Sequence, residues 1–85
     1  MRDGSREYDI YPNPVKDKLN IRSADDRNVR VKVFSGTGAK VFESDFGISP
    51  FEPAQIDMNG YRSGSYTVVV RSGESEDKYV VVKSE

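Results

Sequence analysis

Residues 29–46, VRVKVFSGTGAKVFESDF, decide the fold class of this chain. The three valines that open the stretch alternate with basic residues, which is the two-residue period of a strand with one buried face. SGTG predicts a hairpin turn, because its glycines can adopt positive φ. A second strand is predicted over residues 39–46, with either Val41 or Phe42 turned inward. The stretch therefore predicts an antiparallel β-hairpin.

Similar alternation recurs on both sides of this hairpin, and Gly, Pro, Asn, Asp or Ser interrupts it at short intervals. No window has the apolar spacing of an amphipathic helix. Evenly spaced short strands with turn signals between them are typical of a β-sandwich. The predicted fold is therefore all-β, an immunoglobulin-like antiparallel β-sandwich of about seven short strands. These strands are predicted over residues 8–11, 18–22, 29–34, 39–46, 54–58, 65–71 and 78–83.

The alternation also predicts the core, because residues two apart on a strand share a face. In the last strand, KYVVVK, we expect Val80 and Val82 to face inward and Val81 to be exposed on the opposite face. The predicted core consists of Ile10, Leu19, Ile21, Val29, Val31, Val33, Val41, Ile56, Tyr66, Val68, Val70, Val80 and Val82.

Length and charge narrow the class of protein. The chain has 85 residues, enough for one small domain of modest stability. Its formal net charge of −1 argues against a nucleic-acid-binding domain, which would carry a basic excess. No apolar run approaches the roughly 20 residues that span a bilayer, so we expect no bilayer insertion. Residues 1–7 are mostly polar and are interpreted as a linker remnant, with the domain over residues 8–85.

The residue types available limit the chemistry of the domain. The chain contains no His and no Cys, so the commonest general base and the commonest soft nucleophile are missing. We therefore predict that the domain is not an enzyme and uses no cofactor or metal. One alternative is a loose calcium site on the acidic turns, which lack the regular ligand spacing of a calcium loop. The acidic residues concerned are Asp25, Asp26, Glu74, Glu76 and Asp77.

Aromatic residues leave a second alternative open, a carbohydrate-binding or adhesion module of a surface protein. Four tyrosines could stack against a sugar, although tyrosines on strands are more often half-buried with a solvated hydroxyl. The tyrosines concerned are Tyr8, Tyr11, Tyr61 and Tyr79.

A rigid kink is predicted near the start of the chain, in IYPNPVKDKLNI at residues 10–21. Pro12 and Pro14 cannot donate a ladder hydrogen bond, so they lie outside any central strand. Each proline also favours an extended conformation for the residue before it. The kink should end the first strand and aim the second, and it could carry the chain from one sheet to the other.

Four elements in order resemble the type A C-terminal sorting domain of the type IX (Por) secretion system of Bacteroidetes. The first is YPNPVKDKLNI at residues 11–21. The second is VRVKVFSGTGAKVF, with Gly38 in the glycine position. The third, IDMNGYRSGSYTVVV, supplies Gly64 and Tyr66, and the fourth is KYVVVK at residues 78–83.

One position departs from this pattern. Tyr61 lies where the family usually has a leucine, in the turn before Gly-x-Tyr. We expect this difference to change the side-chain packing around that turn. The rest of the pattern is present.

The resemblance implies a secretion signal. Such a domain is recognised by the secretion machinery in the periplasm, and it directs its parent protein across the outer membrane of a Gram-negative bacterium to the cell surface or beyond. A sortase-type surface protease is a second implied partner. The parent is either exported cargo or a component of the machinery itself. The recognition residues implied are Tyr11, Pro12, Asn13, Pro14, Gly38, Gly64, Tyr66, Lys78, Tyr79, Val80, Val81, Val82 and Lys83.

Recognition through the last strand also has a physical basis. A terminal strand at a sheet edge presents unpaired backbone groups, which a receptor strand can bind. The same edge could pair with a second copy of the chain, so a homo-oligomer through an edge strand is a further prediction.

Overall fold

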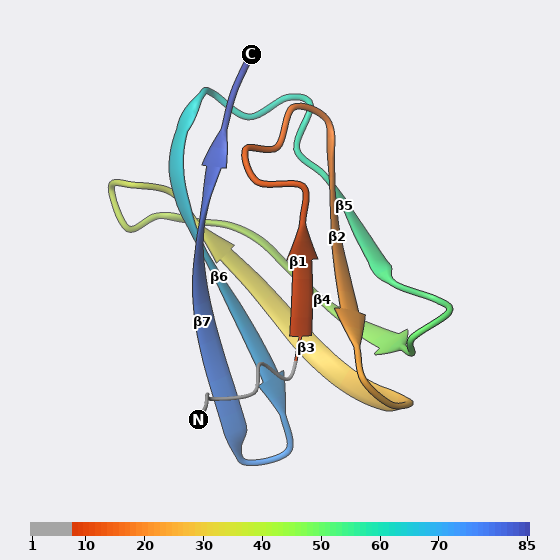
Figure 1. Ribbon diagram of the computed structural model, residues 1–85. Coiled ribbons are helices and arrows are strands. Elements are labelled where there is room, and N and C mark those ends of the chain that lie inside the picture. Colours follow the sequence, from red (N-terminus) through yellow and green to blue (C-terminus); the bar gives the residue numbers. More distant parts are fainter. Residues whose placement is uncertain (1–7) are drawn as a thin grey trace, which may run out of the picture.

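The computed structural model describes residues 8–85, which form two antiparallel sheets packed face to face (Figure 1). No helix occurs in this range, which confirms the predicted all-β sandwich. One sheet has the order β1-β2-β5, with β1 at Tyr8–Tyr11, β2 at Lys18–Ser23 and β5 at Ala54–Asp57. The other has the order β4-β3-β6-β7, with β4 at Lys40–Ile48, β3 at Arg27–Phe34, β6 at Gly64–Ser72 and β7 at Ser75–Lys83.

The β3–β4 hairpin forms where the sequence predicted it. Gly38 has a φ of 91°, and its N–H donates to the Ser35 carbonyl at 2.9 Å. Phe42 pairs with Val33 and packs against the core. Val41 was expected in the core as well, but it is 41% exposed, because the register shifts beside it and leaves it unpaired. That part of the predicted core is wrong.

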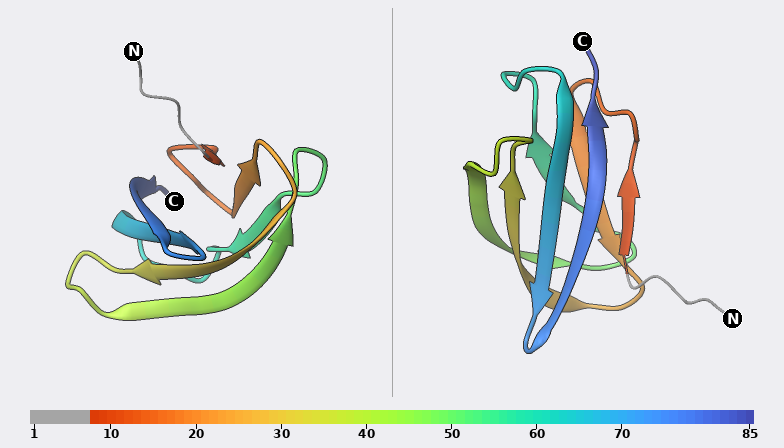
Figure 2. Two further views of the ribbon diagram at one scale, coloured as in Figure 1. Left: turned by 90° about the horizontal axis from the view of Figure 1, so that it is seen from below. Right: turned by 90° about the vertical axis from the view of Figure 1, so that its left-hand side faces the viewer.

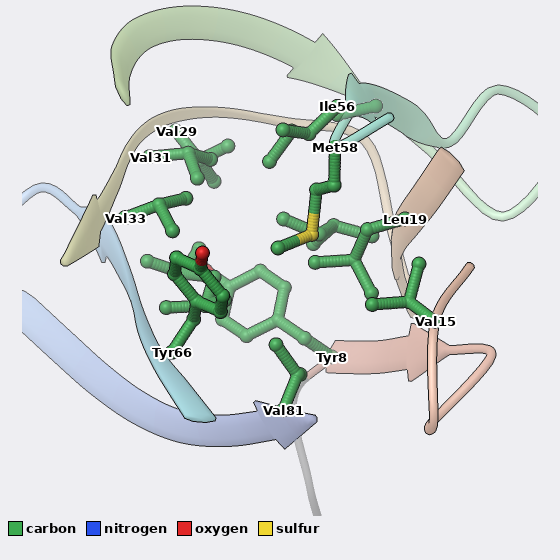
Figure 3. Close-up of a cluster of buried hydrophobic side chains, with 14 of the residues drawn as sticks. Tyr8, Val15, Leu19, Val29, Val31, Val33, Ile56, Met58, Tyr66 and Val81 are labelled. Atoms are coloured by element: carbon green, nitrogen blue, oxygen red, sulfur yellow. The ribbon is translucent and has the colours of Figure 1, made fainter. Parts of the chain in front are cut away.

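The core lies between the two sheets, and both contribute to it (Figure 3). Val31 is completely buried, which confirms the register predicted for the central hairpin. Ile10 packs against the core but is only partly buried. The other predicted core residues that are buried are Leu19, Ile21, Val29, Val33, Ile56, Tyr66, Val68 and Val70, and residues not predicted include Tyr8, Val15, Ile48, Met58 and Val81.

The last strand faces the opposite way from its prediction. Val81 is only 1% exposed, whereas Val80 and Val82 are 64% and 43% exposed. Directly opposed residues of an antiparallel pair share a face of the sheet. Val81 pairs with Tyr66, whose ring points into the core, so Val81 must point inward as well. The expected inward orientation of Val80 and Val82 is therefore wrong.

The proline kink carries the chain between sheets only briefly. β1 and β2 pair with each other, with Ile10 opposite Ile21, so both strands belong to the same sheet. Between them the chain reaches the other sheet at Val15, which forms a parallel bridge with Lys83. The kink thus brings the chain beside the other sheet at this point, but the strand that follows it returns to the sheet of β1.

Candidate recognition site

The proline segment, residues 11–15, lies along the C-terminal end of β7 (Figures 1 and 2). It connects β1 to the start of β2, and both of its X–Pro peptide bonds are cis. The two motifs furthest apart in the sequence therefore meet in space. This meeting point is the candidate recognition site.

Hydrogen bonds of Asn13 and Val15 attach the segment to β7 and to Ser84, the residue that follows this strand. The Val82 N–H donates to Asn13 Oδ1 at 2.9 Å, and Asn13 Nδ2 donates to the Val80 carbonyl at 3.4 Å. Val15 N–H then donates to the Val82 carbonyl, and Ser84 N–H donates to the Val15 carbonyl, both at 2.8 Å. The Asn13 amide takes the place that a peptide group of a neighbouring strand would occupy, since it offers one acceptor and donors together.

Two prolines explain why the Asn13 side chain, and not the backbone, bonds to the edge of β7. A proline has no N–H, so the backbone around Asn13 cannot supply a regular ladder. Pro12 and Pro14 are themselves exposed and line a shallow, mostly apolar hollow beside Ser84. The segment therefore covers the end of the β7 edge with an asparagine amide while it keeps its two proline rings at the surface.

The two faces of β7 differ in character. On the outer face, Lys78 is exposed together with the two outward valines described above. On the inner face, the Tyr79 ring meets the Tyr8 ring edge-on, with centroids 6.5 Å apart. Lys83 is only 5% exposed, and its ammonium group donates to the Ser84 carbonyl at 2.9 Å. Its aliphatic stem is thus buried while its charge is held at the domain end.

Gly64 and Tyr66 adjoin this region through β6. Gly64 pairs with Lys83 and has a φ of 145°, a conformation that side chains strongly disfavour. A Cβ added to Gly64 would meet no atom within 4 Å, so the backbone conformation favours glycine here and crowding does not. The Tyr66 ring is buried, and its hydroxyl donates to the Arg62 carbonyl at 2.6 Å, as expected for a ring in the core with its hydroxyl at the rim.

Tyr61, the position that departs from the family pattern, packs on this tyrosine. The Tyr61 and Tyr66 rings are stacked with their centroids 5.5 Å apart. Partial burial raises the pKa of the Tyr61 hydroxyl above its usual value. A tyrosine thus fills the place of the usual leucine by stacking.

The remaining predicted residues lie apart from the Asn13 contacts. Gly38 belongs to the β3–β4 turn and lines a hollow on the outer face of the four-stranded sheet. Tyr11 is 39% exposed, and the Arg22 guanidinium lies 5.8 Å from the centre of its ring. The structure thus joins Asn13 to the last strand, and it leaves Gly38 at a separate turn.

Two residues of the site were missed by sequence reasoning. Val15 is fully buried, and its N–H and carbonyl bond to Val82 of β7 and to Ser84 just after it, although Val15 stands alone in a polar turn. An isolated valine directly after Pro14 is a signal that could have indicated a buried contact. Ser84 donates to the Val15 carbonyl from its backbone N–H at 2.8 Å and from its hydroxyl at 3.5 Å, and the backbone contact has no side-chain pattern in the sequence.

Neither the tyrosine platform nor the acidic calcium site, the two alternatives left open by the sequence, is formed in residues 8–85. Tyr8 is buried, and Tyr61 and Tyr79 pack against the core, so the four tyrosines share no exposed face. Within residues 8–85 no three acidic residues come together as a metal site would require. Asp25 instead pairs with Arg27 at 2.7 Å. In the same range no helix is long and apolar enough to cross a membrane.

Comparison with known protein families identifies the family of this chain. The family model of the secretion system C-terminal sorting domain matches residues 9–83, from β1 to the end of β7. The chain belongs to this family. The sorting domain is accordingly a C-terminal signal for type IX secretion, which implies interaction with the secretion machinery and export of the parent protein to the cell surface or extracellular space.

A solved structure shares the fold of the sorting domain. It is the dimeric latent PorU from Porphyromonas gingivalis, with a TM-score of 0.60 and 20% sequence identity. The similarity covers 98% of this chain and 10% of that protein. At this identity the likeness shows the fold alone. No curated protein sequence matches the chain at a significant level.

Proposed function

We propose that the type IX machinery recognises the sorting domain in the periplasm through β7, as a folded strand held in place by the proline segment. The observation that carries this proposal is the pair of hydrogen bonds from the Asn13 side chain to Val80 and Val82, residues that lie up to 69 positions away. These bonds fix the strand while both valine side chains remain exposed. Exposed apolar side chains on a rigid strand are suited to contact a receptor.

Part of the β7 edge also remains open to a partner strand. Val82 directs its N–H and carbonyl towards the proline segment and away from β6. Alternate residues of an antiparallel strand point their backbone groups the same way. The Lys78 backbone therefore points outward too, and no residue among 8–85 is bonded to it there. We propose that a receptor strand, or a second copy of the domain, pairs at this half of the edge.

Removal of the domain after export completes the proposal. A sortase-type protease at the cell surface would cleave the sorting domain from its parent and join the parent to an anionic lipopolysaccharide, as the family resemblance implies. The sorting domain itself performs no catalysis in this scheme. The absence of His and Cys from the sequence supports that assignment.

An export assay tests the proposed function. Residues 1–85 are fused to the C-terminus of a reporter that carries its own signal for the inner membrane, in a bacterium with type IX secretion. Surface antibody labelling should detect the reporter in wild-type cells. A strain without the type IX translocon should retain it in the periplasm. Equal surface labelling in both strains, or none in either, would refute the function.

A further inference from the structure

The outer face of the four-stranded sheet is divided into two halves with different chemistry. On the β4 side, cations and carboxylates neutralise one another. Arg30 contacts Glu43 at 2.6 Å and Asp45 at 3.2 Å, and Lys40 also contacts Glu43. On the β6–β7 side, by contrast, Lys32 and Lys78 form no ion pair with any carboxylate in the described part of the chain.

A groove runs along β6 in this second half. Its floor is formed by the small outward side chains of β6, Ser65, Thr67 and Val69. Larger side chains of β3 form one wall and those of β7 form the other. The wall residues are Lys32 and Phe34 on β3, and Glu76 and Lys78 on β7, with Ser35, Gly36 and Gly38 closing one end.

Strand register places the groove residues in successive rows across the sheet. One row is Lys32, Val69 and Lys78, so a lysine stands on each side of the floor. Glu43 continues this row on β4 beyond Lys32, where Arg30 and Lys40 bind its carboxylate. The next row is Phe34, Thr67 and Val80, which is apolar on both sides of a small residue. Glu76 lies in the row beyond the lysines, opposite Arg71, so that row places one carboxylate beside one cation on β6 and β7, whereas the lysine row places two cations on the walls of the groove.

The row spacing fits an extended peptide. Adjacent rows lie two residues apart along β6, which is about 6.5–7 Å. Side chains on one face of an extended segment repeat at the same interval. An acidic side chain over the lysine row would therefore place the residue two positions along over the apolar row.

We propose that this groove binds an extended acidic segment of the secretion machinery, in which a carboxylate residue and an apolar residue are two positions apart. The inference rests on the proposed function, and it adds the chemistry of the partner. A partner with basic residues would be repelled by Lys32 and Lys78. The exposed valines of β7 border the groove, so the two surfaces can contact one partner together.

A charge-reversal variant tests the groove in the export assay. Lys32→Glu combined with Lys78→Glu should leave the fold intact, because both side chains are at the surface, and circular dichroism checks this. The matched control is Lys40→Glu combined with Arg62→Glu, which makes the same charge change on exposed residues outside both the groove and the proline segment. We expect surface display to fall at least tenfold in the groove variant and to be normal in the control.

The outcomes separate this inference from the proposed function. Normal display of the folded groove variant, in cells that display the unaltered domain, overturns the groove inference and leaves the proposed function standing. Failure of the unaltered domain itself refutes the proposed function. Equal loss in the groove variant and the control shows sensitivity to net charge alone, which also overturns the groove inference.

A peptide titration tests the partner chemistry directly. The probe is a nine-residue peptide, Thr-Glu-Thr-Val-Thr-Glu-Thr-Val-Thr, followed by NMR of the isotope-labelled domain. The amide shifts of Lys32, Val69 and Lys78 should change most, and added salt should weaken binding. The same peptide with Lys in place of Glu should bind at least tenfold more weakly. Equal binding of the two peptides, shifts centred on the proline segment, or no shifts at millimolar peptide would contradict the proposal.

Discussion

Val80 and Val81 are adjacent valines of β7 in opposite environments, and truncating each to Ala compares those environments directly. Val81→Ala removes buried methyl groups opposite Tyr66 and should lower the free energy of unfolding by on the order of 1–3 kcal/mol. Val80→Ala, at a side chain that is 64% exposed, should change it by less than about 0.5 kcal/mol. Urea denaturation measures both. Equal effects of the two changes would contradict the orientation of the strand.

Glu43 makes a pH-dependent contribution to stability. Hydrogen bonds from Lys40 and then Arg30 lower the pKa of its carboxyl group to about 2. A depressed folded pKa stabilises the native state above the unfolded value of about 4.3, and this contribution disappears as the pH falls to about 2. The melting-temperature difference between the wild type and Glu43→Gln should therefore be larger at pH 7 than at pH 2. A difference that stays constant over this range would contradict the pKa assignment.

Asn13 acts at the scale of the element, because its side chain attaches the proline segment to the end of β7. Asn13→Ala removes both side-chain hydrogen bonds and should destabilise the domain by about 0.5–1.5 kcal/mol. Hydrogen exchange of the Val82 amide should accelerate, because that N–H loses its acceptor. The Val81 amide, which points towards β6, should change much less and serves as the internal control.

Asn13→Asp provides a second comparison at this position. A carboxylate still accepts from the Val82 N–H, but it has no donor for the Val80 carbonyl. The Val82 amide should consequently remain better protected in Asn13→Asp than in Asn13→Ala. Unchanged Val82 exchange in the alanine variant would mean that the hydrogen bond contributes little to holding the strand.

Sequence alone predicted those elements whose signals are local. Alternating valines and the SGTG turn were sufficient to predict the β3–β4 hairpin, because the two-residue period indicates a strand and the glycines indicate a tight turn after it. The orientation of β7 was predicted wrongly, because three consecutive valines do not show which face of the strand is apolar. The register could have been derived from the turn before it. Ser72 pairs with Ser75 across Gly73, whose φ is 62°, and counting back from this two-residue turn places Val81 opposite Tyr66.

At the scale of the whole molecule, the sequence predicted the family and the structure supplied the site. Four motifs in order identified a sorting domain, but no local pattern shows that the first motif bonds to the last. The bridge between Val15 and Lys83 joins opposite ends of the chain through a single residue pair, which has no sequence signature. The groove along β6 was equally hidden, because its lysine row is formed by three separate strands.

The central claim is that the machinery recognises β7 as a folded strand through its exposed valines. The most direct test measures surface display of a reporter fused to a variant in which these valines are replaced. The variant Val80→Ser combined with Val82→Ser keeps the inward side of β7 unchanged, and circular dichroism checks its fold. Val41→Ser is the matched control, because Val41 is an exposed valine on the distant edge strand β4 of the same sheet. We predict that the β7 variant stays in the periplasm and that the control reaches the surface. Normal display of the folded β7 variant would contradict the claim.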